Sequence, residues 1–220
     1  MNIIFVNFGT KYTPWDVNRL YDGLKKYDKG FKYYVYTDNG IKDLGLYGLE
    51  FTVVKPMKPT LPKWWNKLAM FSEAFPAKGK NLYFDLDTII KGDPFTILDN
   101  IDWDKLTMID CHWKSKDIVR LTNLDVTVNS SVLAWHSDNP KIHNIWNHFN
   151  SGYKDYYLRK YVGIDRFLAH EPFEKDMFDY FPHDYVMSYK YESHDKVAPV
   201  ITFEELDFGS IDTVQIAQAS

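Results

Sequence analysis

The stretch Asn81-Leu82-Tyr83-Phe84-Asp85-Leu86-Asp87-Thr88-Ile89-Ile90 joins a short apolar run to two carboxylates. The run is typical of a buried strand, which we expect to extend to Asp87. On such a strand the side chains of Asp85 and Asp87, at positions i and i+2, lie on one face. Carboxylates held this close repel each other and lose water, and a divalent cation would remove both costs.

A cation at this pair would be Mg²⁺ or Mn²⁺, because both prefer oxygen ligands and keep coordination positions for substrate phosphates. It would stabilise a departing diphosphate as a Lewis acid. The position agrees, since α/β sheets bind ligands at the carboxyl ends of their strands. The bland alternative is that Asp87 caps the following turn and Asp85 pairs with a nearby lysine. The tripeptide alone leaves both interpretations open.

The flanking sequence predicts an α/β domain. Thr13-Pro14 is a helix-start signal, with a capping hydroxyl and proline at the first helical position. Short apolar or β-branched runs indicate strands at 3–6, 33–37, 51–54, 106–109, 128–135 and 197–203. Apolar periodicity indicates helices from Pro14, at 63–75, at 140–149 and at 165–170. The opening order, β-α-β-β, is typical of α/β proteins.

Composition narrows the class of protein. The chain has 220 residues, 45% hydrophobic and 25% charged, as one soluble globular domain would have. A net charge of −4 without a long basic run argues against a nucleic-acid partner. The single cysteine, Cys111, excludes an intramolecular disulfide and a cysteine-based zinc site, and we expect it to be buried. We find no leader and no transmembrane segment, so we expect a cytoplasmic protein.

The segment around Asp85 and Asp87 resembles the Asp-x-Asp segment of glycogenin-like and bacterial galactosyltransferase-like GT-A glycosyltransferases. Four further pieces resemble this family in order and spacing, and together they span about residues 1 to 190. They are Gly9-Thr10-Lys11-Tyr12, Trp64-Trp65-Asn66-Lys67-Leu68, Val128-Asn129-Ser130-Ser131-Val132-Leu133-Ala134-Trp135 and Gly163-Ile164-Asp165-Arg166-Phe167-Leu168.

The resemblance implies a donor site on the first half of the chain. Gly9, Thr10 and Tyr12 would lie against the nucleotide, and Lys67 would reach the diphosphate. Asp85 would contact the donor and, with Asp87, hold Mn²⁺ or Mg²⁺. Two plainer roles stay open, because Tyr12 could simply pack and Lys67 could extend into solvent from its helix.

The resemblance also implies catalytic residues beside the donor sugar, namely Asn129 and Asp165. Asn129 could equally satisfy the end of a strand. The family has Gly where this chain has Ser131, and Asp-Gln where it has Ile164-Asp165. The face toward the donor sugar is therefore expected to differ from that of the family.

The family closes with a His-x-x-Gly-x-x-Lys-Pro segment whose His completes the metal site, and this chain has no such segment. His194 could substitute, but we favour a solvated surface histidine. An open donor site, weak donor affinity and hydrolysis of the donor without acceptor are the expected consequences.

The expected fold is a single α/β, GT-A (Rossmann-like) domain over residues 1–220, with a mixed, mostly parallel sheet flanked by helices. Residues 1–90 would form the nucleotide half, 91–203 the acceptor half and 204–220 a polar tail. The expected reaction is metal-dependent transfer of a hexosyl group from a nucleotide-diphosphate sugar, taken as a UDP sugar, to a carbohydrate or other hydroxyl acceptor. The resemblance implies retention at the anomeric carbon.

Two other functions are compatible with the sequence. An apolar strand followed by Asp-Leu-Asp also resembles haloacid-dehalogenase-type phosphatases, in which the first Asp attacks phosphorus. That motif opens the chain and has Thr two places after the second Asp, whereas here Thr88 follows Asp87 directly. A degenerate, non-catalytic sugar-nucleotide-binding domain is the third possibility, favoured by the missing closing segment.

Overall fold

The first strand, β1 (Asn2–Asn7), lies inside the main sheet, which explains why nearly all of its residues are apolar. Successive side chains of a strand point to opposite faces. Ile3 and Phe5 therefore join the core on one face of the sheet, and Ile4 and Val6 join the core on the other. A strand covered on both faces must have apolar residues in both registers, and β1 meets that requirement.

The computed structural model describes residues 1–38, 51–56, 61–114, 127–193 and 197–203. Within these ranges the main sheet has seven strands in the order β3-β2-β1-β4-β7-β6-β8. The other strands are β2 (Lys32–Thr37), β3 (Phe51–Val54), β4 (Lys80–Phe84), β6 (Leu106–Asp110), β7 (Val128–His136) and β8 (Phe178–Tyr180). Only β7 runs antiparallel to its neighbours, which confirms the mixed, mostly parallel sheet.

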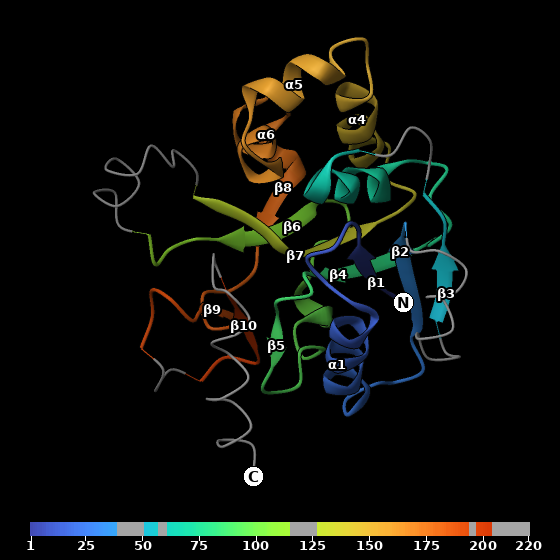
Figure 1. Ribbon diagram of the computed structural model, residues 1–220. Helices are drawn as coiled ribbons and strands as arrows, with labels where there is room; N and C mark the ends of the chain where they lie inside the picture. The colour runs from blue at the N-terminus through green and yellow to red at the C-terminus, as the bar shows by residue number, and fades with distance from the viewer. Residues whose placement is uncertain (39–50, 57–60, 115–126, 194–196, 204–220) are drawn as a thin grey trace.

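Helices cover both faces of this sheet (Figure 1). The helix α1 (Pro14–Lys25) lies on one side, where Val17, Leu20 and Leu24 share a core with β1. The other side carries η1 (Lys63–Phe71), α4 (Pro140–Phe149), α5 (Lys154–Lys160) and α6 (Ile164–His170). Two single-turn helices are η2 (Leu98–Asn100) and η3 (Lys175–Met177). A small second sheet has the order β5 (Ile89–Ile90), β10 (Val200–Thr202) and β9 (Val186–Ser188).

Aromatic packing joins η1 to the helices beside it. The Trp65 ring stacks on Phe149 of α4 with centroids 5.2 Å apart, and it meets Phe167 of α6 edge-on at 6.0 Å. All three side chains are buried. Rings of this size contribute large apolar areas to a core, so this contact fixes where η1 lies over the sheet.

Three sequence expectations need correction. The helix predicted at 63–75 is a 3₁₀ helix that ends at Phe71. The Asn66 side chain holds its start in place, since it accepts from the Leu61 N–H at 3.0 Å and donates to the Leu61 carbonyl at 2.6 Å. The strand expected to reach Asp87 ends at Phe84, and the last predicted strand is only Val200–Thr202. The short elements α5, β5, β8 and β9 were not predicted.

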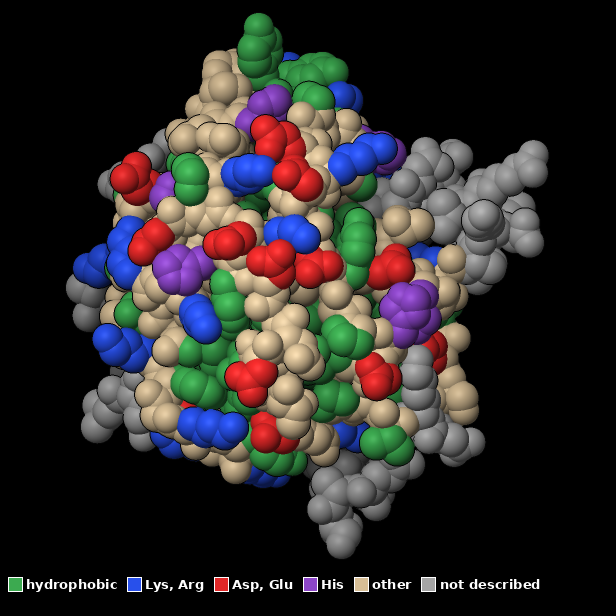
Figure 2. Space-filling model, turned by 180° about the vertical axis from the view of Figure 1, so that it is seen from behind, with side chains coloured by type: hydrophobic (Ala, Val, Ile, Leu, Met, Phe, Trp, Pro, Cys, Tyr) green, Lys and Arg blue, Asp and Glu red, His purple; other side chains and the backbone are tan. Residues whose placement is uncertain are grey.

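Other expectations are confirmed. The helix α4 has the predicted bounds, α1 begins at Pro14, and Cys111 is buried. Among the helices that the structure describes, none combines the length and the apolar character that a membrane crossing requires. Figure 2 shows acidic and basic side chains interspersed over the rear face, with apolar side chains at the top, where α5 lies in Figure 1, and between the charged groups of the lower half.

The Trp65 contact gives a test of this packing. Replacing a buried tryptophan by alanine removes its transfer free energy and leaves a cavity. Trp65→Ala should therefore lower the free energy of unfolding in urea by about 3–5 kcal/mol. Trp15→Ala is the matched control, because Trp15 is 58% exposed, and it should change stability by less than about 0.5 kcal/mol. Equal losses in the two variants would contradict the assigned core.

Candidate active site

The two predicted carboxylates flank a turn at the carboxyl end of β4. The Asp85 N–H donates to the Ser131 carbonyl at 2.7 Å, which is the last link to β7, and the Thr88 N–H donates to the Asp85 carbonyl at 3.0 Å. The i to i+3 hydrogen bond closes the turn. The turn, rather than a shared strand face, therefore brings Asp85 and Asp87 together.

Arg19 of α1 holds this turn from the face of the sheet that α1 covers. Its guanidinium donates to the Leu86 carbonyl at 2.6 Å and to the Thr88 carbonyl at 3.3 Å. A planar, always-charged group that bonds two carbonyls of one turn fixes the backbone between them. The sequence gave no sign of this role, because Arg19 lies 67 residues before Leu86 and belongs to no motif.

Asp85 is the more heavily compensated of the two carboxylates. The Lys67 ammonium lies 2.6 Å from one of its oxygens and 2.7 Å from the other. The Tyr83 hydroxyl donates to Asp85 as well. The side chains of Lys67 and Asp85 are only 11% and 20% exposed. At this level of burial each charged group needs the other as its partner, since either charge alone would be costly.

Tyr83 has a second contact with the same lysine. The Lys67 ammonium lies 5.3 Å from the centroid of the Tyr83 ring, within cation–π range. Burial, and then the charge of Asp85, raise the pKa of the Tyr83 hydroxyl well above its ordinary value. Tyr83 therefore stays protonated and can donate to Asp85.

Asp87 is bound mainly by a neutral partner. The Tyr12 hydroxyl donates to it at 2.7 Å, and the Lys11 ammonium is 3.7 Å away but largely exposed. Burial, and next the negative charge of Asp85, raise the pKa of the Asp87 carboxyl above its ordinary value. The like-charge repulsion predicted from the sequence is therefore present and only partly relieved by the protein.

The Tyr12–Asp87 hydrogen bond spans the topological switch point of the sheet. From β1 the chain continues to β2 and β3 on one side, while β4 lies on the other side of β1. Loops that leave adjacent parallel strands in opposite directions open a crevice at the carboxyl ends, where such folds bind ligands. The loop after β1 carries Tyr12, and the turn after β4 carries Asp87.

Gly9 begins the loop after β1 with a left-handed conformation, at φ 76°. Its N–H donates to the Asp38 carboxylate, at 3.1 Å to one oxygen. The next residue, Thr10, has an exposed side chain. A left-handed φ favours glycine, so this position explains Gly9 without reference to a nucleotide. The predicted contacts of Gly9 and Thr10 with a nucleotide stay predictions.

Asp165 and Asn129 each accept a hydrogen bond from the backbone near the start of β7. The Asp165 carboxylate accepts from the Ser130 N–H at 2.9 Å, and the Asn129 side-chain oxygen accepts from the Ser131 N–H at 2.7 Å. Burial raises the pKa of the Asp165 carboxyl, and the positive charge of Lys67 opposes that rise. Asp165 therefore belongs to the same electrostatic group as Lys67 and Asp85. Asn129 fills the strand-end role in the described structure, and a sugar contact for it stays a prediction.

The carboxylate pair fits a divalent cation. Its repulsion is a cost that a cation would remove, and its ligand atoms are the oxygens that Mg²⁺ and Mn²⁺ prefer. Within the described ranges no group of three or more His, Cys, Asp or Glu side chains could hold a metal ion. A cation here would therefore rely on Asp85 and Asp87 together with oxygen ligands from water or substrate. His194 and the tail 204–220 lie outside the described residues, so their predicted roles are untested.

A second chain of polar side chains lies at the same carboxyl edge. His183, which follows β8, is 3.3 Å from Asp110 at the end of β6. Its ring stacks on His112 with centroids 4.0 Å apart, and His112 is 3.3 Å from Glu192. The sequence does not predict this cluster, because its members come from separate segments with no motif spacing.

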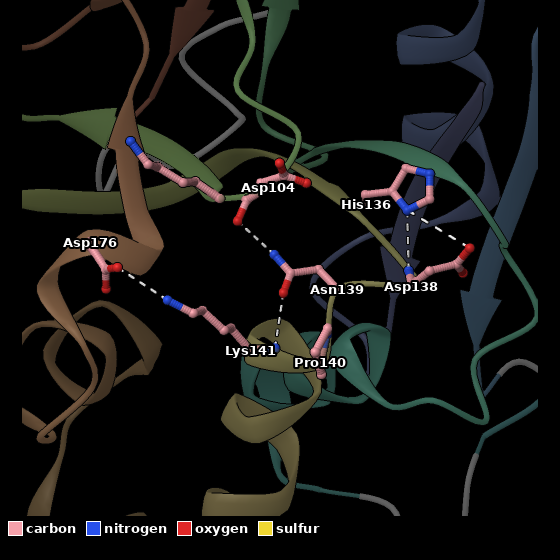
Figure 3. Close-up of a pocket in the computed structure, with 8 residues that line it drawn as sticks. Asp104, His136, Asp138, Asn139, Pro140, Lys141 and Asp176 are labelled. Carbon is pink, nitrogen blue, oxygen red and sulfur yellow. Dashed lines mark hydrogen bonds and ion pairs between the residues drawn. The ribbon is translucent and has the colours of Figure 1, made fainter.

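A pocket of about 490 Å³ lies away from these residues (Figure 3). It is lined by His136, and His136 pairs with Lys80 at the opposite end of β4 from Asp85. Its charged groups already bond one another, since Lys141 is 3.1 Å from Asp176. Asn139 lies between the Asp104 carbonyl and the Lys141 N–H and caps α4. These contacts account for Lys141, Asp176 and Asn139 without a ligand.

The Lys67–Asp85 pair can be tested without any ligand. Lys67→Met leaves the carboxylate short of its charged partner, so stability at pH 7 should fall by about 1–3 kcal/mol. Adding Asp85→Asn to Lys67→Met should recover part of that loss, because the unpaired charge is gone. Urea unfolding of the wild type, both single variants and the double variant measures this coupling. Strictly additive losses would show that the two side chains do not interact.

Comparison with known proteins places this architecture. No protein-family model matches the sequence, and no curated protein sequence matches it. Among solved structures, the chain is similar to the galactosyltransferase LgtC in complex with donor and acceptor sugar analogues. The identity is 15%, the match covers 92% of this chain and 87% of that one, and the TM-score is 0.62.

Two further glycosyltransferases match over most of this chain. GlyE of Streptococcus pneumoniae TIGR4 is 12% identical over 99% of this chain and 64% of that one, with a TM-score of 0.66. Mouse xyloside xylosyltransferase 1 is 10% identical over 91% of this chain and 97% of that one, with a TM-score of 0.55. At such identities the likeness establishes the fold. The chain has the GT-A fold of these glycosyltransferases, as the resemblance in its sequence predicted.

Proposed function

We propose that this protein is a metal-dependent glycosyltransferase that moves a hexosyl group from a UDP sugar to a hydroxyl acceptor, with retention at the anomeric carbon. The observation that carries the proposal is the carboxylate pair, Asp85 and Asp87, at the topological switch point of a GT-A sheet. The structural likeness to LgtC, solved with donor and acceptor sugar analogues, supports the same reaction class.

Asp85 and Asp87 would hold Mn²⁺ or Mg²⁺. When bound, the cation would supply positive charge to the departing diphosphate. Tyr12 positions Asp87 through its hydroxyl, and Arg19 positions the turn through Leu86 and Thr88. These contacts fix the carboxylates before any ligand arrives, so they have little conformational freedom left to lose on binding.

Lys67 is the proposed phosphate ligand of the protein itself. Its ammonium is held between Asp85 and the Tyr83 ring, and its charge also acts on Asp165. A cation would take over the neutralisation of Asp85. The lysine charge would then be free to stabilise the phosphates of the donor, which carry the opposite sign.

Asp165 and Asn129 are the proposed residues beside the donor sugar. Both are anchored on the backbone of β7, so their side chains are held near Asp85 by main-chain hydrogen bonds. Carboxylate and amide groups can accept hydrogen bonds from sugar hydroxyls. We propose that they orient the hexosyl group for transfer. Gly9, Thr10 and Tyr12 would line the nucleotide side of the crevice.

The phosphatase alternative is not favoured by this geometry. It requires Asp85 as an attacking nucleophile, and the Lys67 ammonium and Tyr83 hydroxyl bound to this carboxylate lower the nucleophilicity of its oxygens. The sheet also places Asp85 after its fourth strand in chain order. A non-catalytic domain would bind a UDP sugar in the same crevice, and turnover with a hydroxyl acceptor separates it from the enzyme.

The cation role of Asp87 is tested by binding. Removing one negative charge and one oxygen ligand by Asp87→Asn should abolish the tightening of UDP binding by Mn²⁺. Isothermal calorimetry with UDP, with and without Mn²⁺, measures it. Asp104→Asn is the matched control, because Asp104 lies in the remote pocket of Figure 3, and it should bind as the wild type does. Unchanged metal dependence in Asp87→Asn would refute the assignment.

The phosphate role of Lys67 has a two-sided test. A hydrogen bond to a charged group is worth about 1.5–3 kcal/mol, so Lys67→Met should weaken UDP binding at saturating Mn²⁺ by about tenfold or more. The same variant should bind Mn²⁺ alone more tightly, because Lys67 no longer competes for Asp85. Lys80→Met, at the far end of β4, controls for general charge. Equal weakening in both variants would show that no specific phosphate contact exists.

A further inference from the structure

Trp64 is a large aromatic side chain that the fold leaves 45% exposed, although its neighbour Trp65 is buried. Both lie on η1, which is a 3₁₀ helix. Such a helix has three residues per turn, so side chains at i and i+3 are eclipsed. Trp64 and Lys67 therefore project from the same side of η1, and Lys67 reaches Asp85.

The indole also lies against the start of α6. A Cβ atom placed on Gly163 would be 3.5 Å from the Trp64 Nε1 atom and 3.9 Å from Cδ1. Gly163 is the N-cap of α6, two residues before Asp165. The Trp64 ring is therefore bounded by Lys67 on its own helix and by the segment that carries Asp165.

The Trp64 side chain lies on the opposite side of Asp85 from the loop after β1. Tyr12 and the loop after β1 reach Asp87, whereas Lys67 and Trp64 approach Asp85 from η1 on the other face of the sheet. A nucleobase placed along the β1 loop would not meet Trp64. An occupant of the Trp64 surface would instead reach the site from the side of α6.

We propose that Trp64 is the acceptor subsite, and that it stacks on the pyranose ring of a carbohydrate acceptor. The proposal rests on the proposed transfer reaction and names its acceptor class. A pyranose has an apolar face of C–H groups and a polar rim of hydroxyls. The exposed indole offers a surface for the first, and Asp165, two residues after Gly163, offers an acceptor for the second. A ringless alcohol would gain nothing from the indole.

The test uses the full-length protein loaded with UDP and Mn²⁺. Methyl β-D-galactopyranoside and methyl β-D-glucopyranoside are the pyranose probes, and glycerol is the ringless hydroxyl probe. Saturation-transfer NMR should show a pyranoside bound through its C–H protons and glycerol not bound. Trp64→Ala should weaken the affinity for the pyranoside by about tenfold, and Trp64→Phe should retain most of that affinity. Tyr153→Ala, which removes an aromatic ring 68% exposed elsewhere, should have no effect.

UDP calorimetry on the same variants separates this proposal from the proposed function. Trp64→Ala should bind UDP with Mn²⁺ as tightly as the wild type, which also shows that it is folded. If UDP binds the wild type but neither pyranoside does, or if Trp64→Ala binds a pyranoside unchanged, the acceptor subsite is wrong and the transferase proposal survives. If UDP itself does not bind, the proposed function fails instead.

Discussion

The burial of two neighbouring carboxylates at the end of β4 is the constraint around which this structure is arranged. Asp85 is compensated by Lys67 and Tyr83, while Asp87 depends on the Tyr12 hydroxyl and keeps a raised pKa. These partners come from η1, from β4 itself and from the loop after β1. The charge pair thus links the two faces of the sheet at its switch point, and a fold that placed any of these elements elsewhere would leave a buried charge uncompensated.

This compensation is unequal, and the inequality has chemical meaning. A fully neutralised pair would gain little from a cation, and an uncompensated pair would destabilise the fold. One buried lysine for two carboxylates, with Lys11 largely exposed and farther from Asp87, leaves negative charge that a divalent cation can remove. The same lysine then belongs both to the metal-free protein, as the partner of Asp85, and to the proposed donor complex, as a partner of phosphate.

Much of the fold could be predicted from local signals in the sequence. Thr13-Pro14 marked α1, the apolar run before Asp85 marked β4, and the α4 bounds were read directly. Short elements such as α5 and β8 were missed because a few residues give no reliable periodicity. The 3₁₀ form of η1 depends on the Asn66 contact with Leu61, which propensity does not encode.

The residues of the candidate site also divide into those that the sequence predicts and those that it does not. Asp85 and Asp87 could be predicted from the sequence because they lie two residues apart in one short motif. The structure also contains part of the alternative interpretation, since Asp85 does pair with a lysine. That pairing does not exclude the functional role, because the lysine is the one that the family resemblance assigned to the diphosphate. Arg19 and the His112–His183 stack could not be predicted, since each acts through a contact between segments far apart. Tyr83 lies inside the motif, but its place in an apolar run indicated only a buried strand residue and not a donor to Asp85.

The small second sheet completes the support of the turn. Ile89 and Ile90, directly after the turn, pair with Ile201 and Val200 of β10. The Pro199 carbonyl accepts from the Lys91 and Gly92 N–H groups, and a Cβ on Gly92 would lie 3.3 Å from the Pro199 backbone. The carboxylates are thus held by α1 and by the strand at residues 200–202, which pack on the same face of the main sheet. Backbone fixed by two elements favours a preorganised site, in which ligand binding changes charge more than shape.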